Sequence, residues 1–264
     1  MPSEATKPDK ARGEFSLTVS RALSVLATFS SERPTLGLAE ISRDVGVSKQ
    51  SALRFLQALM MHGFVDQDPK TKLYRPGYEA FRIGDLVRSE RGLEKAALPR
   101  LRQLSEACGF TSYLSVIRND RMLILASVSG SGPLLFAARV GETLPVPSTA
   151  TGQAALACMS DDEVAVLIKR TGLPRVTQAT PTTMTELTKR IREIRTRNFA
   201  VSWEQNLLGI ASVASAVAAP DGELRAVISI GFATSQVKKS ECAKLGDKVR
   251  ATSRAIASDL VNFE

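Results

Sequence analysis

Side chains that can bond to the edges of nucleic-acid bases recur on one side of the segment from Ser48 to Gln57. Lys49 and Arg54 carry N–H donors that suit guanine or phosphate, and Gln50 can bond to adenine. Leu53 stands on the same side, where an apolar side chain can contact a thymine methyl group. Any exposed helix can carry such residues, so the elements around this segment decide between DNA recognition and an ordinary surface.

The opposite side of the same segment predicts a core-facing helix. Apolar residues follow the spacing i, i+3, i+4 and i+7, namely Ala52, Phe55, Leu56 and Leu59. Ser48 is a favourable N-cap, and Gly63 suits the position just after the last turn. Both ends of an amphipathic helix are therefore marked in the sequence.

Two further helices precede this segment, and a basic hairpin follows it. The helices are "LTVSRALSVLATF" and "GLAEISRDVG", the second ending at the tight turn Gly46-Val47. The hairpin "FVDQDPKTKLYRPG" turns at Asp68-Pro69 and is basic. This order is typical of a winged helix-turn-helix, which places one helix in the major groove. The residues predicted to contact DNA are Ser48, Lys49, Gln50, Ser51, Leu53, Arg54, Gln57, Lys70, Lys72 and Arg75.

A second candidate site is the segment "PVPSTATGQAALACM", where small and hydroxyl-bearing residues run into a helix start. The free N–H groups and the dipole at a helix N-terminus favour an anion such as a carboxylate. The predicted cradle consists of Ser148, Thr149, Ala150, Thr151 and Gly152. A helix capped by Thr149 or Thr151, with no ligand, explains the same pattern.

Two later strands add small residues to this candidate site. Ser212 and Ala214 share one face of their strand, as do Ser229 and Gly231, because side chains alternate along a strand. If these faces adjoin, they leave room for a ligand or for a tightly packed helix. Trp203, the only tryptophan, offers a flat face for an aromatic ligand or for core packing.

Composition sets broad limits on the class of protein. The 264 residues suffice for one large or two ordinary domains, with 44% hydrophobic and 23% charged residues. A net charge of +8 favours an acidic partner such as nucleic acid. The three cysteines are far apart and fit no disulfide or zinc framework, so a reducing cytoplasm is the expected location. No apolar run approaches the ~18 residues that span a bilayer, and no membrane partner is expected.

The sequence offers nothing for catalysis. The only histidine, His62, lies at the end of the predicted third helix, and the second domain has no GxSxG, GxxxxGKS or metal-ligand cluster. We therefore expect no catalytic residues, no metal site, no cofactor and no enzymatic activity.

The whole chain is predicted to be α+β. The expected parts are a flexible tail over 1–16, the winged helix-turn-helix over 17–77, a linker helix over 78–92 and an effector-binding and oligomerisation domain over 93–264. In that last domain, "SYLSVI" and "MLILASV" form one antiparallel hairpin, and "IASVASAV" and "LRAVISIGF" form another. Capping boxes at Ser160/Glu163 and Thr183/Glu186 start helices between them. The linker carries apolar residues that suit a dimer interface or a spacer.

From about Val19 onward the chain resembles the IclR-type bacterial transcription regulators. The matching segments are "SRALSVLATF", "GLAEISRDVGVSKQSALRFLQALMMHGFV", "YRPGYEAFRIGDL", "RVGETLPVPSTATGQAALA", "LPRVTQAT", "EIRTRNFAVSWEQNLLGIASVASAV" and "VISIGF". The resemblance implies a winged helix bound to a double-stranded operator, a GAF-like domain that binds a small effector, and homodimers or dimers of dimers. It also implies repression or activation, often of genes for the catabolism of organic or aromatic acids.

The chain departs from this family where effectors are often held. Ser202 and Trp203 replace acidic residues, Ala211-Ser212 replaces an Arg-Cys pair, and Pro147 stands where histidine is usual. These departures speak against a glyoxylate-like or pyruvate-like effector, and an aromatic carboxylate is the preferred expectation. One alternative is a domain that only oligomerises and senses nothing, and another is an enzyme that acts on a small acid. A cavity between residues 150–152 and the Ser212 and Ser229 strands distinguishes a sensor from a domain that only oligomerises.

Overall fold

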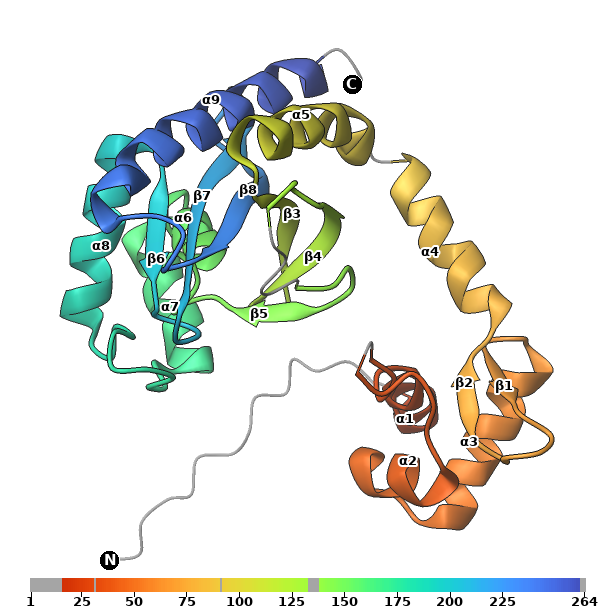
Figure 1. The fold of residues 1–264 in the computed structure, drawn as a ribbon. Helices are drawn as coiled ribbons and strands as arrows, with labels where there is room; N and C mark the ends of the chain where they lie inside the picture. Colours follow the sequence, from red (N-terminus) through yellow and green to blue (C-terminus); the bar gives the residue numbers. More distant parts are fainter. Residues whose placement is uncertain (1–15, 31, 91, 133–137, 262–264) are drawn as a thin grey trace, which may run out of the picture. The chain divides into compact units, whose positions relative to one another are not determined.

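The computed structural model describes residues 16–30, 32–90, 92–132 and 138–261 (Figure 1). The chain forms two compact units, residues 1–87 and 88–264. The predicted tail lies outside the described residues except for Ser16, whose hydroxyl accepts a hydrogen bond from the N–H of Val19.

The N-terminal unit is built from helices and one small hairpin. Its elements are α1 (Leu17–Leu26), α2 (Leu38–Val45), α3 (Lys49–Met61), β1 (Val65–Gln67), β2 (Tyr74–Pro76) and the first part of α4 (Tyr78–Glu90). The three helices and the hairpin surround one core, which is formed by Val25, Leu36, Ile41, Leu56, Val65 and Tyr74. The apolar spacing of the third helix is confirmed, because Ala52 and Leu56 are fully buried while Phe55 and Leu59 pack partly buried at the edge.

The C-terminal unit contains one six-stranded antiparallel sheet with helices on both faces. Its elements are α5 (Leu93–Cys108), β3 (Thr111–Arg118), β4 (Arg121–Val128), β5 (Thr143–Pro145), α6 (Ala150–Ala157), α7 (Asp161–Thr171), α8 (Met184–Arg197), β6 (Ala200–Trp203), β7 (Ile210–Ala218), β8 (Leu224–Ala233), the short 3-10 helix η1 (Lys239–Glu241) and α9 (Cys242–Val261). In the sheet, the strands follow the order β5-β4-β3-β8-β7-β6. The two predicted hairpins are confirmed, and the pairing of β3 with β8 joins them into one sheet.

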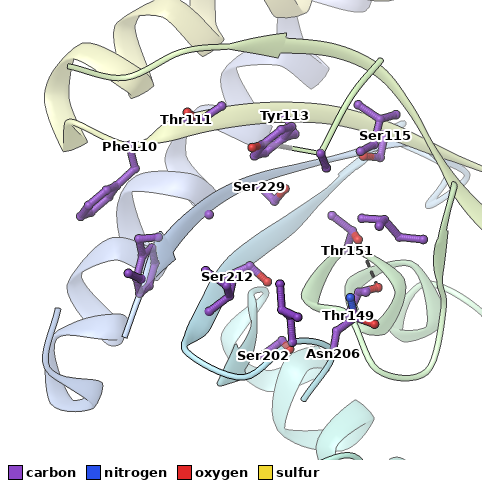
Figure 2. Close-up of a pocket in the computed structure, with 18 of the residues that line it drawn as sticks. Phe110, Thr111, Tyr113, Ser115, Thr149, Thr151, Ser202, Asn206, Ser212 and Ser229 are labelled. Atoms are coloured by element: carbon purple, nitrogen blue, oxygen red, sulfur yellow. Dashed lines mark hydrogen bonds between the residues drawn. The ribbon is translucent and has the colours of Figure 1, made fainter. Parts of the chain in front are cut away.

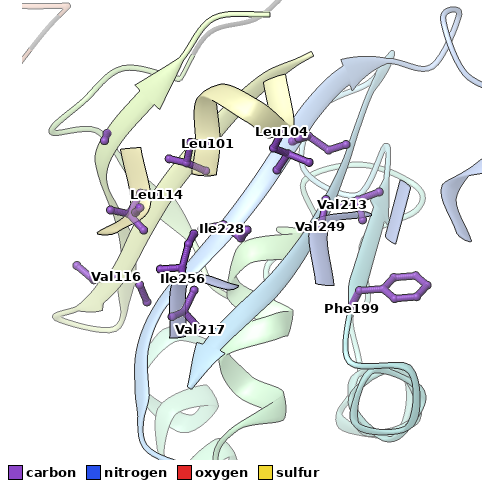
Figure 3. Packing of buried hydrophobic residues seen from close by; sticks show 14 of the residues in the cluster. Leu101, Leu104, Leu114, Val116, Phe199, Val213, Val217, Ile228, Val249 and Ile256 are labelled. Carbon is purple, nitrogen blue, oxygen red and sulfur yellow. The ribbon is translucent and has the colours of Figure 1, made fainter. Parts of the chain in front are cut away.

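One face of this sheet is covered by α5 and α9 (Figure 1, Figure 3). Alternate strand residues point into that layer, with Leu114 on β3, Val213 on β7 and Ile228 on β8 packed against Leu101 and Val249 of the two helices. The other face carries a separate core under α6, α7 and α8. Five of the strands therefore divide their side chains between two cores, namely β3, β4, β6, β7 and β8.

The helix caps agree with the sequence except in one detail. Ser160 and Glu163 form the predicted capping box at the start of α7. At α8 the Thr183 hydroxyl accepts from the N–H of Glu186, but the Glu186 carboxylate accepts from the N–H of Thr182 instead of completing the box. Across the described ranges, no helix is long and apolar enough to cross a membrane.

Candidate functional site

The predicted DNA-facing side of α3 is open to solvent. Lys49, Gln50, Arg54 and Gln57 are exposed, whereas Leu53 is only half-buried. Ser48 caps the helix as predicted, because its Oγ accepts the backbone N–H of Ser51 at 3.2 Å. The Ser48 hydroxyl is therefore already engaged in capping α3, and any contact of this hydroxyl with DNA occurs in addition to that hydrogen bond. Helix α3 thus has a polar, exposed face on one side and a buried, apolar face on the other.

The hairpin between β1 and β2, residues 65–76, forms a wing whose loop is fixed by Asp68. The Asp68 carboxylate accepts the backbone N–H groups of Lys70 and Thr71, each at 2.8 Å. These hydrogen bonds stabilise the charged form and lower the pKa of Asp68 below its usual value. Lys72 has a left-handed backbone with φ of 59°. Lys70, Lys72 and Arg75 are all exposed, so the wing presents three cations.

In the C-terminal unit, the sheet face under α6 is lined with small and hydroxyl side chains. Strand register places Thr111, Gly231, Ser212 and Ser202 side by side across β3, β8, β7 and β6. All four line a cavity, and Figure 2 labels Thr111, Ser202 and Ser212 there. None of these side chains is large enough to fill the space above the sheet, which is why a cavity forms here.

Further residues of β3 and β8 extend the hydroxyl-lined face of the sheet along these two strands. Ser229 lies opposite Tyr113 in the register, and Ser115 follows two residues further along β3. Burial raises the pKa of the Tyr113 phenol, so its neutral form is favoured. Ser115 is fully buried, and its Oγ is the one buried side-chain N or O without a hydrogen-bond partner in the described part of the chain.

The start of α6 closes one side of this cavity. Thr149 Oγ1 accepts the backbone N–H of Gly152 at 3.1 Å and donates to the carbonyl of Pro145 at 2.6 Å. Thr149 therefore acts as the predicted cap, and both Thr149 and Thr151 also line the cavity. At the N-terminus of α6, Thr149 therefore both caps the helix and lines the cavity.

The loop after β6 is fastened to the same helix start. Ser202 Oγ donates to the carbonyl of Ser148 at 3.1 Å, and Ser148 Oγ donates to Asn206 Oδ1 at 3.0 Å. Gln153 Nε2 donates to Gln205 Oε1 at 2.6 Å. These bonds hold β6, its loop and α6 together at the cavity wall.

Aromatic side chains form the other end of the cavity. The rings of Phe110 and Phe232 lie 5.0 Å apart and both line the space. The non-atom space within the cavity and its solvent-open mouth together is about 900 Å³.

The structure brings together only part of the predicted effector site. Thr149, Thr151, Ser212, Ser229 and Gly231 line the cavity. Ser148, Ala150 and Gly152 are buried beside it but do not line it. A Cβ on Gly152 would lie 2.0 Å from the carbonyl oxygen of Val146, so this glycine permits close backbone packing instead.

Trp203 lies on the wrong side of the sheet for the predicted stacking role. Ala200 and Ser202 face α6, so alternation turns Val201 and Trp203 toward the α9 side, where both pack against the other core. The signal in the sequence for this placement is the alternation within "AVSW", which becomes informative once that segment is recognised as a strand.

Sequence reasoning missed the contribution of β3 and of the loop after β6. The cavity residues outside the predicted set include Phe110, Thr111, Tyr113, Ser115, Ser202, Asn206, Leu207, Ile210 and Phe232. Thr111, Tyr113 and Ser115 share a strand face by simple alternation, but only the pairing of β3 with β8 puts that face beside Ser229. Among the residues that the structure describes, no three His, Cys, Asp or Glu side chains form a group that could hold a metal ion.

Two family models together match most of the chain. Residues 18–69 match the IclR helix-turn-helix domain, and residues 86–258 match the C-terminal domain of the bacterial transcriptional regulator IclR. The chain belongs to the IclR family. It is therefore a DNA-binding transcription regulator of α+β fold, in agreement with the fold class expected from the sequence.

Known members of the IclR family align over nearly the whole chain. The HTH-type transcriptional regulator XynR of Escherichia coli is 26% identical over 243 residues, which cover 92% of this chain and 96% of that protein. An IclR regulator from Alicyclobacillus acidocaldarius has a TM-score of 0.82 at 25% identity, covering 92% of this chain and 98% of the other. An IclR homologue from Microbacterium hydrocarbonoxydans, crystallised with 4-hydroxybenzoate, has a TM-score of 0.80 at 19% identity. The match covers 93% of this chain and 99% of that chain.

Proposed function

We propose that this IclR-family regulator binds a duplex operator through α3 and the wing, and that a small molecule in the cavity changes its operator affinity. For the DNA half, the supporting observation is the exposed polar side of α3 opposite its buried side. For the effector half, it is the cavity between the start of α6 and the hydroxyl-lined face of the sheet. A domain that only oligomerises has no need of such a space.

Each part of the DNA-binding surface has a different role in this proposal. Arg54, Gln50 and Gln57 project from the exposed side of α3 and suit base edges in the major groove. The wing cations and Lys49 suit phosphates, which orient the protein without reading sequence. Ser48 and Ser51 lie at the N-terminus of α3, where backbone N–H groups also favour a phosphate.

The regulator is further proposed to act as a homodimer or a dimer of dimers. On α1, Leu17, Val19 and Leu23 are exposed, and on α4 Tyr78 and Phe81 are 86% and 67% exposed. Apolar side chains gathered on two helices of one unit suit a protein interface better than water. A dimer also matches the usual geometry of helix-turn-helix proteins, which bind paired half-sites.

The alternative of an enzyme receives no support from the cavity. Its described lining contains no histidine, cysteine, lysine or carboxylate that could act as a nucleophile or general base. We therefore propose regulation without catalysis, and action in the cytoplasm, where bacterial DNA lies.

Selection of duplexes from a random library by the full-length chain tests the DNA half. The expected result is enrichment of one site with two related half-sites, which an Arg54→Ala variant enriches poorly. Arg102→Ala, which removes an exposed arginine from α5, is the matched control and should select the same site as the wild type. Failure of the wild-type chain to enrich any sequence would contradict the proposal.

A further inference from the structure

The cavity in the C-terminal unit is lined without a single charged side chain in the described part of the chain. Its polar groups are the hydroxyls of threonines, serines and Tyr113 and the amides of Asn206 and Gln236. A buried anion loses its hydration free energy, and no charged side chain of this lining compensates for that loss.

The hydroxyls near α6 have few hydrogens left for an anion. Thr149 donates to the carbonyl of Pro145, Ser202 donates to the carbonyl of Ser148, and Thr151 Oγ1 lies 3.3 Å from Thr149 Oγ1 as its donor. A carboxylate offers about four acceptor positions and no donor. Hydroxyl hydrogens already given to backbone carbonyls cannot serve it.

Unlike the hydroxyls near α6, those of Ser115, Ser212 and Ser229 on the sheet face do not donate to backbone carbonyls within the described structure. Ser115 Oγ is fully buried and unpartnered in the described structure, and no hydrogen bond within that structure occupies the hydroxyls of Ser212 and Ser229. A serine hydroxyl both donates and accepts, so it suits a group that does the same or a neutral carbonyl. An unpaired hydroxyl in the cavity wall costs free energy until a ligand or water satisfies it.

The two ends of the cavity differ in polarity. Figure 2 shows Phe110 at one end and Ser115 with Thr151 at the other, and Phe232 lies against Phe110. A ligand that fills this space meets aromatic rings at one end and hydroxyls at the other. Flat apolar bodies stack well against such rings.

Building on the proposed function, we propose that the effector is an uncharged molecule with a flat, apolar body and a hydroxyl or neutral carbonyl group that hydrogen-bonds to Ser115. This class differs from the organic or aromatic acid expected from the sequence. It includes aromatic alcohols, phenols, esters and amides, and excludes the ionised form of the matching acids.

Calorimetric titration of the full-length protein with matched compound pairs tests the charge. The pairs are methyl 4-hydroxybenzoate with 4-hydroxybenzoate, and benzyl alcohol with benzoate. At pH 7.5 the neutral member of each pair should bind at least about tenfold more tightly, because the ionised acid loses its hydration without gaining a cation. Binding of the acids should weaken by about tenfold for each pH unit above their pKa, because only the protonated form enters.

Substitution of Ser115 tests the polar contact. Ser115→Ala should weaken binding of the neutral compounds by about two- to tenfold, without lowering the melting temperature of the ligand-free protein. Ser112→Ala is the matched control, because Ser112 lies on the opposite face of β3, where its Oγ donates to the carbonyl of Leu101. That variant should lower the melting temperature and leave compound affinity unchanged.

Three results would overturn the inference. They are tighter, pH-independent binding of the acids, binding of none of the four compounds, and unchanged affinity of the neutral compounds in Ser115→Ala. A preference for the acids would leave the proposed function intact, since the cavity would still bind a ligand. The proposed function fails separately, if a compound that occupies the cavity leaves operator affinity unchanged.

Discussion

Arg54 is the residue of α3 whose loss should reduce specificity most. Its exposed guanidinium can form two parallel hydrogen bonds to a guanine, which Lys49 cannot. Arg54→Ala should weaken binding to the selected operator by about 1–3 kcal/mol, with little change on unrelated duplexes. Fluorescence anisotropy at fixed salt measures both affinities, with Arg102→Ala as the control. Equal losses on operator and unrelated DNA would make Arg54 a phosphate contact instead.

Lys72 in the wing should contribute to affinity without contributing to specificity. Because its φ is 59°, alanine at this position strains the loop, whereas asparagine tolerates the left-handed conformation. Lys72→Asn should weaken binding to all duplexes similarly and reduce the slope of log affinity against log salt by about 0.9. An unchanged salt slope in anisotropy titrations would show that Lys72 does not contact phosphate.

At the scale of elements, two helical glycines should respond oppositely to the same substitution. A Cβ on Gly152 in α6 would lie 2.0 Å from the carbonyl oxygen of Val146, whereas nothing lies within 4 Å of a Cβ on Gly84 in α4. Gly152→Ala should destabilise its unit by about 2 kcal/mol through overpacking, while Gly84→Ala should be neutral or stabilise by up to about 1 kcal/mol. Thermal unfolding of both variants measures the difference. A stable Gly152→Ala variant would mean that the β5–α6 connection repacks easily.

Helices were easier to predict from this sequence than the cavity they help to form. The signals for α3 and α7 are local, since the caps Ser48 and Ser160 and the apolar spacing lie within one segment. Strand β6 has only four residues, and its place beside β7 depends on long-range pairing. The sequence alone therefore leaves both roles of Trp203 open, because the pairing of β6 with β7 sets the side of the sheet on which this residue lies.

The same limit applies to the site. Ser212, Ser229 and Gly231 were identified by alternation within β7 and β8, which one hairpin joins. Ser115 was not identified, because β3 meets β8 across more than a hundred residues of sequence. Hydrophobic pattern fixes which residues of a strand share a face, but not which strands become neighbours.

At the scale of the whole molecule, assembly should depend on the exposed apolar residues of α1 and α4. Phe81→Ser should shift the protein toward monomers at micromolar concentration, because the substitution removes apolar area that a partner would bury. Sedimentation velocity measures the change, with Val166→Ser on α7, 54% exposed, as the control. A wild-type protein that sediments as a monomer at all concentrations would exclude the dimer.

Regulation requires that the cavity and the operator influence one another, and this coupling is reciprocal. Gly231 offers a way to block the cavity selectively, because a Cβ there meets Tyr113 at an ordinary 3.6 Å while a longer side chain extends into the space. Gly231→Leu should therefore keep its fold and operator affinity but lose the response to any compound.

The most direct measurement is operator affinity, by anisotropy, with and without a saturating cavity ligand in wild type and Gly231→Leu. The account predicts that the ligand changes wild-type affinity by about fivefold or more and leaves the variant unchanged. Wild-type affinity that stays constant while calorimetry shows the cavity occupied would contradict it.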